Sequence, residues 1–156
     1  MTVTAGTDVY TSLAEADAYF AARAVADWAD ATVAEREAGL LRATAYLDGR
    51  YRWIGTRAVG EQPLGWPRLG ATDAEGRTHT GIPAAVRHAC AELAWIALSY
   101  ELAPQVERGG RVLSERVGSV EVSYAETAPV GRAYPFIDLL LAGLVRSAAA
   151  AAVIRA

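Results

Sequence analysis

Arginine and aromatic residues alternate in the segment Arg50-Tyr51-Arg52-Trp53, and Arg57, Trp66 and Arg68 follow closely. In such a pattern ring faces can stack on nucleic-acid bases while guanidinium groups hold phosphates. This interpretation assigns single-stranded DNA contacts to Arg50, Arg52, Trp53, Arg57 and Arg68. The other interpretation is that Tyr51 and Trp53 pack under the preceding helix while the arginines extend into water. We favour the second, because one short cluster is a weak signal on an acidic chain.

The other residues that could do chemistry form no recognisable catalytic or metal site. The only histidines are His79 and His88, and the only cysteine is Cys90. His88 and Cys90 are two helical positions apart and point to different faces, so Cys90 is expected to be a small core residue. The carboxylates Glu35 and Glu37 lie in a first helical turn, where they complement the helix dipole. We therefore expect a protein that is not an enzyme and has no metal or cofactor.

Composition favours one soluble globular domain, since 156 residues is a typical single-domain length. The formal net charge of −3 does not suggest a protein that coats nucleic acid, and all 15 basic residues are arginine. A single cysteine excludes an internal disulfide, and the first ten residues lack the features of a signal peptide. The only membrane-like segment is 136–156. Asp138 and Arg146 interrupt it, so we expect no membrane span.

Capping signals divide the first half of the chain into helices. Ser12 with Glu15, and Thr32 with Glu35, each fit a capping box. Helices are therefore predicted over 13–23 and 33–48, with Gly49 as the stop of the second. Residues 50–81 contain two prolines and six glycines and are predicted to be irregular, with Trp53, Leu64 and Trp66 as candidate anchors. Pro83 is suited to the first turn of a third helix that runs to about residue 102.

The second half predicts a β-hairpin and a last helix. Residues 111–116 and 119–124 form two strands around Val117-Gly118, and 119–124 alternates apolar and polar residues. A helix is expected over 136–144, followed by an alanine-rich tail. The fold class is thus mainly α: a small helical bundle with a projecting β-hairpin, with an adaptor helical domain at 1–145 and a flexible or docking tail at 146–156. The residues expected to be largely buried are Leu40, Leu41, Leu47, Val86, Leu93 and Tyr100.

In their order and spacing these segments resemble a family of small structural proteins of tailed bacteriophages, the head–tail adaptors. Members of this family are often labelled DnaT-like single-stranded-DNA-binding proteins. The matching segments, in chain order, are 14–20, 41–48, 51–55, 62–68, 82–86 and 114–122. A Trp-Pro-Arg loop between two helices is the most specific of them. Together they cover about residues 10–145, and the tail from Ser147 matches no pattern.

The resemblance implies a virion structural protein that forms a ring, typically of twelve copies, between portal and tail. Such a ring would extend the DNA channel and let DNA pass without specific binding. Its partners would be the portal protein, the next tail or stopper protein and further copies of the chain. It would have no membrane partner, and it would assemble in the bacterial host cytoplasm and lie at the head–tail junction. The alternative function is a single-stranded-DNA-binding replication accessory protein.

Intermolecular contacts of the expected ring are assigned to the hairpin and the C-terminal segment. A two-stranded hairpin with one apolar face is marginal in water unless something covers that face. The simpler alternative is that helix 136–144 closes the core of its own domain. The candidate oligomer or portal contacts are Arg111, Arg116, Val120, Val122, Tyr124, Leu141, Leu144 and Arg146.

Overall fold

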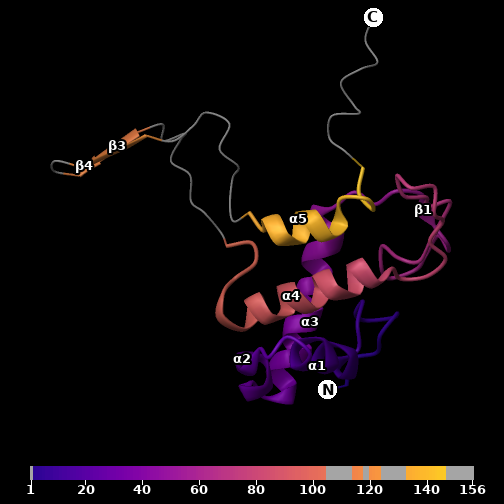
Figure 1. Cartoon of the computed structure of the whole chain (residues 1–156), viewed down its shortest axis with the longest axis horizontal. Coiled ribbons are helices and arrows are strands. Elements are labelled where there is room, and N and C mark those ends of the chain that lie inside the picture. Colours follow the sequence, from indigo (N-terminus) through magenta and orange to yellow (C-terminus); the bar gives the residue numbers. More distant parts are fainter. Residues whose placement is uncertain (1, 105–113, 118–119, 124–132, 147–156) are drawn as a thin grey trace, which may run out of the picture.

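The computed structural model describes residues 2–104, 114–117, 120–123 and 133–146 and shows a mainly helical chain (Figure 1). The predicted fold class is confirmed within these residues, which form five helices and a small antiparallel hairpin. The helices are α1 (Leu13–Ala21), α2 (Ala26–Asp30), α3 (Val33–Arg50), α4 (Ala84–Ser99) and α5 (Pro135–Leu141). The strands are β1 (Thr56–Arg57), β2 (Arg68–Leu69), β3 (Ser114–Val117) and β4 (Val120–Ser123).

Both predicted capping boxes are present at helix starts. The Ser12 hydroxyl accepts from the Glu15 backbone N–H at 3.2 Å, and the Glu15 carboxylate accepts from the Ser12 backbone N–H at 3.0 Å. Thr32 and Glu35 form the same reciprocal pair at the start of α3. Each box satisfies backbone donors that a helix start leaves without an intrahelical partner. The starts of α1 and α3 were therefore set by four local residues.

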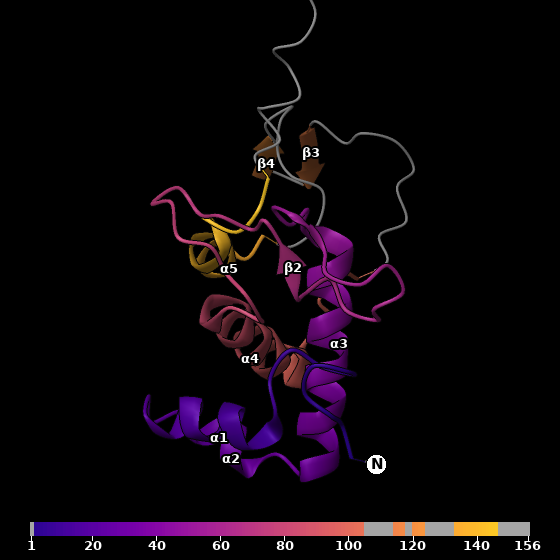
Figure 2. The ribbon, with the colours of Figure 1, turned by 90° about the vertical axis from the view of Figure 1, so that its right-hand side faces the viewer.

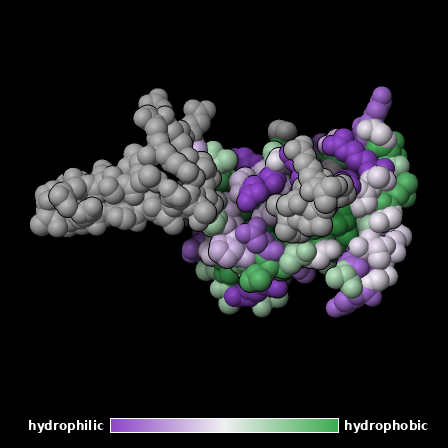
Figure 3. Space-filling view, turned by 90° about the horizontal axis from the view of Figure 1, so that it is seen from above, coloured by the Kyte–Doolittle hydropathy of each residue, from purple (hydrophilic) through white to green (hydrophobic). Residues whose placement is uncertain are grey.

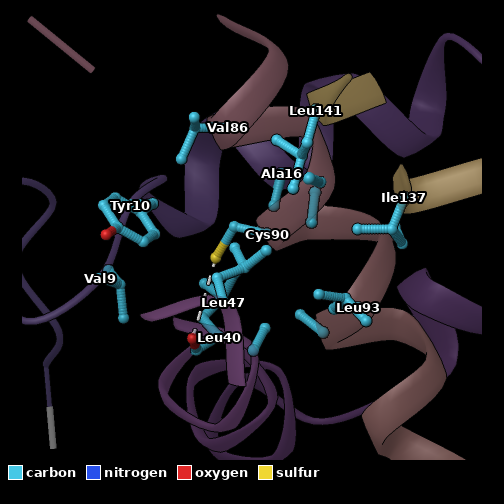
Figure 4. Packing of buried hydrophobic residues seen from close by; sticks show 14 of the residues in the cluster. Val9, Tyr10, Ala16, Leu40, Leu47, Val86, Cys90, Leu93, Ile137 and Leu141 are labelled. Atoms are coloured by element: carbon cyan, nitrogen blue, oxygen red, sulfur yellow. Dashed lines mark hydrogen bonds between the residues drawn. The ribbon is translucent and has the colours of Figure 1, made fainter. Parts of the chain in front are cut away.

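The core lies where α3 packs against α4 and α4 against α5 (Figures 1 and 4). Leu40, Leu47 and Leu93 are fully buried there, as predicted. Cys90 is also fully buried, 3.4 Å from the Thr44 hydroxyl and 3.9 Å from the Leu40 carbonyl oxygen. Burial raises the pKa of the Cys90 thiol to about 11. Cys90 is thus the small, inert core residue that was expected.

Three details of the helices differ from prediction. The five-residue α2 was missed because it is too short to show a helical period. It is held by the burial of Trp28 against Phe20, whose ring centroids are 4.8 Å apart. α3 continues through Gly49 to Arg50, so Gly49 is not its stop. α4 ends at Ser99, and Tyr100 adopts an extended backbone.

Two of the residues expected in the core are not fully buried. Tyr100 is 56% exposed, because the chain leaves helical geometry there and turns the side chain away from the α4 stripe. Leu41 is half-buried at the edge of the core. The buried stripe of α4 includes the predicted Val86 and Leu93, and its full set is Val86, Ala89, Cys90, Ala91, Leu93, Ala94 and Ala97.

The long connection between α3 and α4 is held by large side chains and by one short strand pair. Trp53, Leu64 and Trp66 are 5%, 5% and 0% exposed, so the three predicted anchors are confirmed. β1 pairs with β2 antiparallel, which the prediction of an irregular segment did not include. Two-residue strands carry no periodic signal, so sequence pattern could not reveal them.

The predicted hairpin and C-terminal helix are both present. β3 pairs antiparallel with β4, Ser114 opposite Ser123 and Val117 opposite Val120, and Figure 1 shows the hairpin apart from the helices. Residues 111–113, 119 and 124 of the predicted strands lie outside the described residues. α5 starts at Pro135 and ends at Leu141. It closes the core of its own chain through Ile137 and Leu141, so for this helix the structure supports an intramolecular role over an intermolecular one.

A glycine sets the spacing between α3 and α4. A Cβ on Gly39 would lie 2.9 Å from the Ala94 carbonyl oxygen, a backbone atom that cannot swing away. We expect Gly39→Ala to lower the free energy of unfolding by about 1–2 kcal/mol, since overpacking outweighs the gain in helix propensity. The matched control is Gly49→Ala in the same helix, where a Cβ would meet nothing within 4 Å. Urea denaturation followed by circular dichroism compares the two, and equal stabilisation by both substitutions would contradict the close packing.

Candidate nucleic-acid interface

The end of α3 is tied to the following loop by one carboxylate. Asp48 accepts hydrogen bonds from the Tyr10 hydroxyl, from Trp53 Nε1 at 3.0 Å and from the Gly65 backbone N–H at 2.9 Å. Burial and the contact with Asp48 raise the pKa of Tyr10 far above its ordinary value, so this hydroxyl remains a donor at any ordinary pH. Asp48 therefore joins the N-terminal segment, α3 and the long loop at one point.

The C-terminal segment pairs with the residues that follow α3. The Ile54 N–H donates to the Leu144 carbonyl at 3.0 Å, and the Arg146 N–H donates to the Arg52 carbonyl at 2.7 Å. Trp53 and Val145 form the antiparallel bridge between them. This pairing brings Arg146 beside a segment 94 positions earlier in the chain.

Four arginines converge around a pocket of about 270 Å³ beside this pairing. The lining residues are Asp48, Tyr51, Arg52, Trp53, Arg57, Gly65, Arg68 and Arg146. Asp48 is the only carboxylate among them, and three protein donors already occupy it. Figure 3, which looks onto the α5 side from above Figure 1, shows strongly hydrophilic residues beside hydrophobic ones on this face. The pocket is thus locally cationic on a chain of net charge −3.

The four arginines have different surroundings. The Arg68 guanidinium donates to the carbonyls of Ile54, Gly55 and Gly65 at 2.5, 2.9 and 3.0 Å, so it holds the loop together. Arg146 also donates to the Gly55 carbonyl, at 3.0 Å. Arg52 and Arg57 are exposed and make no side-chain hydrogen bond or ion pair within the described part of the chain.

The arginines of the pocket lie close enough together to affect one another's protonation. Burial lowers the pKa of Arg68, and the neighbouring charges of Arg146 and Arg57 lower it further. A guanidinium nevertheless stays protonated in proteins. An anion placed among these groups would relieve their mutual repulsion, and a phosphate would match the forked donors of arginine.

The aromatic residues of this region form the wall behind the arginines and not a stacking platform. Tyr51 is 8% and Trp53 5% exposed, so the interpretation that they pack under the helix is confirmed. The Trp53 ring lies 5.9 Å from Tyr51 and 6.1 Å from Trp66 between centroids. The indole Nε1–H of Trp53 donates to the Asp48 carboxylate. Bases could stack on these rings only if the core opened.

The structure distributes the remaining candidate residues differently from the prediction. Arg50 is exposed, with its guanidinium carbon 5.7 Å from the Tyr51 ring centroid, and it does not line the pocket. Leu141 and Leu144 were expected at an oligomer or portal interface, but they are 0% and 4% exposed in the core of their own chain. Arg146, assigned to the same interface, belongs to the arginine pocket. The side chains of Arg111, Arg116, Val120, Val122 and Tyr124 lie outside the described residues.

Sequence reasoning gave Asp48 no role and assigned Arg146 to a different site, although both residues organise this region. Asp48 belongs to no recognised binding motif. Arg146 pairs with Arg52, which is remote from it in the chain, so no local sequence signal could have brought these two arginines together. Within the described ranges no three His, Cys, Asp or Glu side chains gather into a possible metal site. No helix of that part of the chain is both long and apolar enough to cross a bilayer.

Comparison with known families gives a match over residues 2–156 to the family described as "Putative DnaT-like ssDNA binding protein". Searches of curated proteins and of solved structures gave no significant match. The family description names single-stranded DNA binding, so the prediction of a phage head–tail adaptor is wrong. Its virion, connector and portal-binding terms have no support. Because the match spans nearly its whole length, the chain belongs to the family of DnaT-like single-stranded-DNA-binding proteins.

Proposed function

We propose that this protein binds single-stranded DNA through phosphate contacts at the arginine pocket. The observation that carries the proposal is the convergence of Arg52, Arg57, Arg68 and Arg146 around one concavity of a net acidic chain. Arg52 and Arg57 provide exposed guanidinium groups, Arg146 adds a third, and Arg68 keeps the loop in place. The family's description is consistent with this assignment.

Contacts with the DNA phosphate backbone suit a single strand better than a duplex at this site. The arginines converge on one pocket, so successive phosphates must approach each other to reach them. A single strand can bend in this way, whereas duplex DNA is stiff over about 150 base pairs. Since the neighbouring rings are buried, little base readout is expected, and binding should depend strongly on salt and weakly on sequence.

The test compares a double variant with a charge-matched control in fluorescence anisotropy with labelled oligo(dT). Arg52→Gln/Arg57→Gln removes two exposed charges from the pocket. Arg23→Gln/Arg42→Gln removes two from exposed positions elsewhere, on the turn after α1 and on α3. The pocket variant should bind roughly 10- to 100-fold more weakly at low salt. The slope of log K against log salt should change from about −2 to about −1, as fewer phosphates are neutralised.

The control variant should keep most of the affinity and the full salt slope. Equal affinities of the pocket and control variants would overturn the proposed site. A wild-type protein with no salt-dependent binding to oligo(dT) would overturn the function itself. Circular dichroism and thermal unfolding check that both variants are folded. The pocket variant is expected to fold, because neither Arg52 nor Arg57 makes a side-chain hydrogen bond in the described structure. The control variant loses the bonds of Arg23 and Arg42 to the Tyr19 and Ala97 carbonyls, so the comparison is made below its own unfolding midpoint.

A further inference from the structure

A second and larger concavity lies at the other end of α3. This groove has a volume of about 720 Å³ and is formed by α2, the first half of α3 and the end of α4. Its lining residues are Asp27, Asp30, Ala31, Glu35, Arg42, Trp95, Ile96, Leu98, Ser99 and Tyr100. Three half-buried apolar side chains, Trp95, Ile96 and Leu98, provide the apolar part of the groove.

The charged residues of the groove are mainly acidic. Glu35 is held by the Thr32 N–H and hydroxyl, and these bonds lower its pKa. Asp27 and Asp30 form no ion pair in the described part of the chain. Among the described lining residues the one cation is Arg42, and it already donates to the Ala97 carbonyl at 2.8 Å. The groove therefore suits a ligand that carries aliphatic side chains next to a positive charge.

The sequence contains such a segment outside the described structure. Residues 147–156 end in Val153-Ile154-Arg155-Ala156, two aliphatic side chains followed directly by an arginine. The preceding residues are mostly alanine, too small to compete for an apolar groove. Val153 and Ile154 match the apolar lining and Arg155 matches the carboxylates Asp27 and Asp30.

The position at which the tail begins makes a neighbouring copy the better acceptor. Figure 2 shows α3 running from the α1–α2 end to the end that carries β2 and α5. The tail follows Arg146, at the β2 and α5 end, whereas Glu35 is about 22 Å away along the axis of α3. From Arg146 to Arg155 the chain spans about 14 Å as a helix, the conformation alanine favours, and about 30 Å only when fully extended.

We propose that the tail segment 153–155 of one copy docks into the acidic groove of a second copy. The contact joins two different surfaces, so each copy offers a tail at one end and a groove at the other. Such a head-to-tail interface can be repeated from copy to copy. The docking itself is independent of DNA. Its consequence, cooperative filling of a long single strand, rests on the proposed function.

The first experiment measures self-association of the full chain by sedimentation velocity over a range of concentrations. Ile154→Asp places a charge where the groove is apolar and should weaken association at least roughly tenfold. Ala150→Ser is the matched tail control and should associate like wild type. Arg155→Glu should weaken association, and Asp27→Arg/Asp30→Arg combined with Arg155→Glu should restore it. A full chain that is monomeric throughout, or an Ile154→Asp protein that associates like wild type, overturns the proposal.

A second measurement identifies the acceptor surface. A fluorescent peptide of residues 147–156 is titrated with full-length Ile154→Asp protein, whose own tail cannot compete. Binding should be lost when Asp27→Asn/Asp30→Asn is added, and kept when the exposed residue Glu61 is changed to Gln. Peptide binding by a protein whose wild type stays monomeric would show that each groove takes its own tail, which also overturns the proposal.

DNA of two lengths separates this inference from the proposed function. An oligo(dT) of about 15 nucleotides offers room for roughly one copy, and one several times longer accommodates several. Ile154→Asp should leave affinity for the short strand unchanged and abolish cooperativity on the long one. Cooperativity that persists in this variant counts against tail docking. Absence of binding to both strands by wild type counts against the DNA function and leaves the sedimentation result to decide the docking.

Discussion

Replacing Asp48 with alanine is expected to lower the free energy of unfolding by about 3–5 kcal/mol. The substitution leaves three donors without an acceptor: the Tyr10 hydroxyl, Trp53 Nε1 and the Gly65 N–H. Tyr10 and Trp53 are 1% and 5% exposed, so water cannot easily replace the lost carboxylate. Each unsatisfied buried donor costs about 1–3 kcal/mol, and the three costs are not strictly additive.

Two further variants make the Asp48 result specific. Asp48→Asn keeps an amide oxygen at the position that accepts from Tyr10 and Trp53 and loses the acceptor for Gly65, so its effect should be intermediate. Glu61→Ala removes an exposed carboxylate of the same long loop and should change stability by about 0.5 kcal/mol or less. Urea denaturation followed by tryptophan fluorescence measures all three. An Asp48→Ala protein as stable as Glu61→Ala would show that this carboxylate does not hold the loop.

Leu93→Ala is the second substitution with a large expected effect, a loss of about 2–5 kcal/mol. Leu93 is fully buried on α4, the helix that packs against both α3 and α5 (Figure 4). Its truncation leaves a cavity that helices on two sides would have to move to fill. The cost therefore includes lost contacts as well as lost transfer free energy.

Leu139→Ala on α5 is the control for Leu93→Ala. Leu139 is 75% exposed, so the same chemical change should alter stability by about 0.5 kcal/mol or less. Thermal unfolding followed by circular dichroism compares the two variants. Similar midpoints for both would show that Leu93 does not lie in a tightly packed core.

The mistaken adaptor prediction came from a resemblance in the order and spacing of short segments, and it was supported only by features that many proteins share. A sequence with no recognised catalytic motif, an acidic net charge and an alternating hairpin strand is compatible with a ring protein but does not specify one. Fold and composition constrain function only weakly, because function depends on particular sites. The site most relevant to the family match, the arginine pocket, was only partly visible in the sequence, since Arg52, Arg57 and Arg68 were noticed without Arg146.

The sequence by itself determined the features that depend on neighbouring residues. Ser12 with Glu15 and Thr32 with Glu35 set two helix starts, because a capping box closes within four residues. The 3.6-residue period identified Leu40, Leu47, Val86 and Leu93 as core. The hairpin followed from alternation, and the burial of Trp53 and Trp66 from the need of a long loop for large anchors.

Only the tertiary structure decided what depends on distant partners. The strand-like pairing of residues 52–54 with 144–146 places Arg146 beside Arg52, and nothing local encodes that register. Asp48 became a junction because Tyr10 and Gly65 arrive from two other parts of the chain. Capping and periodicity act over a few residues, whereas the arginine pocket forms only when segments separated by tens of residues in the sequence come together. The loops between these segments are stabilised by contacts that exist only once the whole chain has folded.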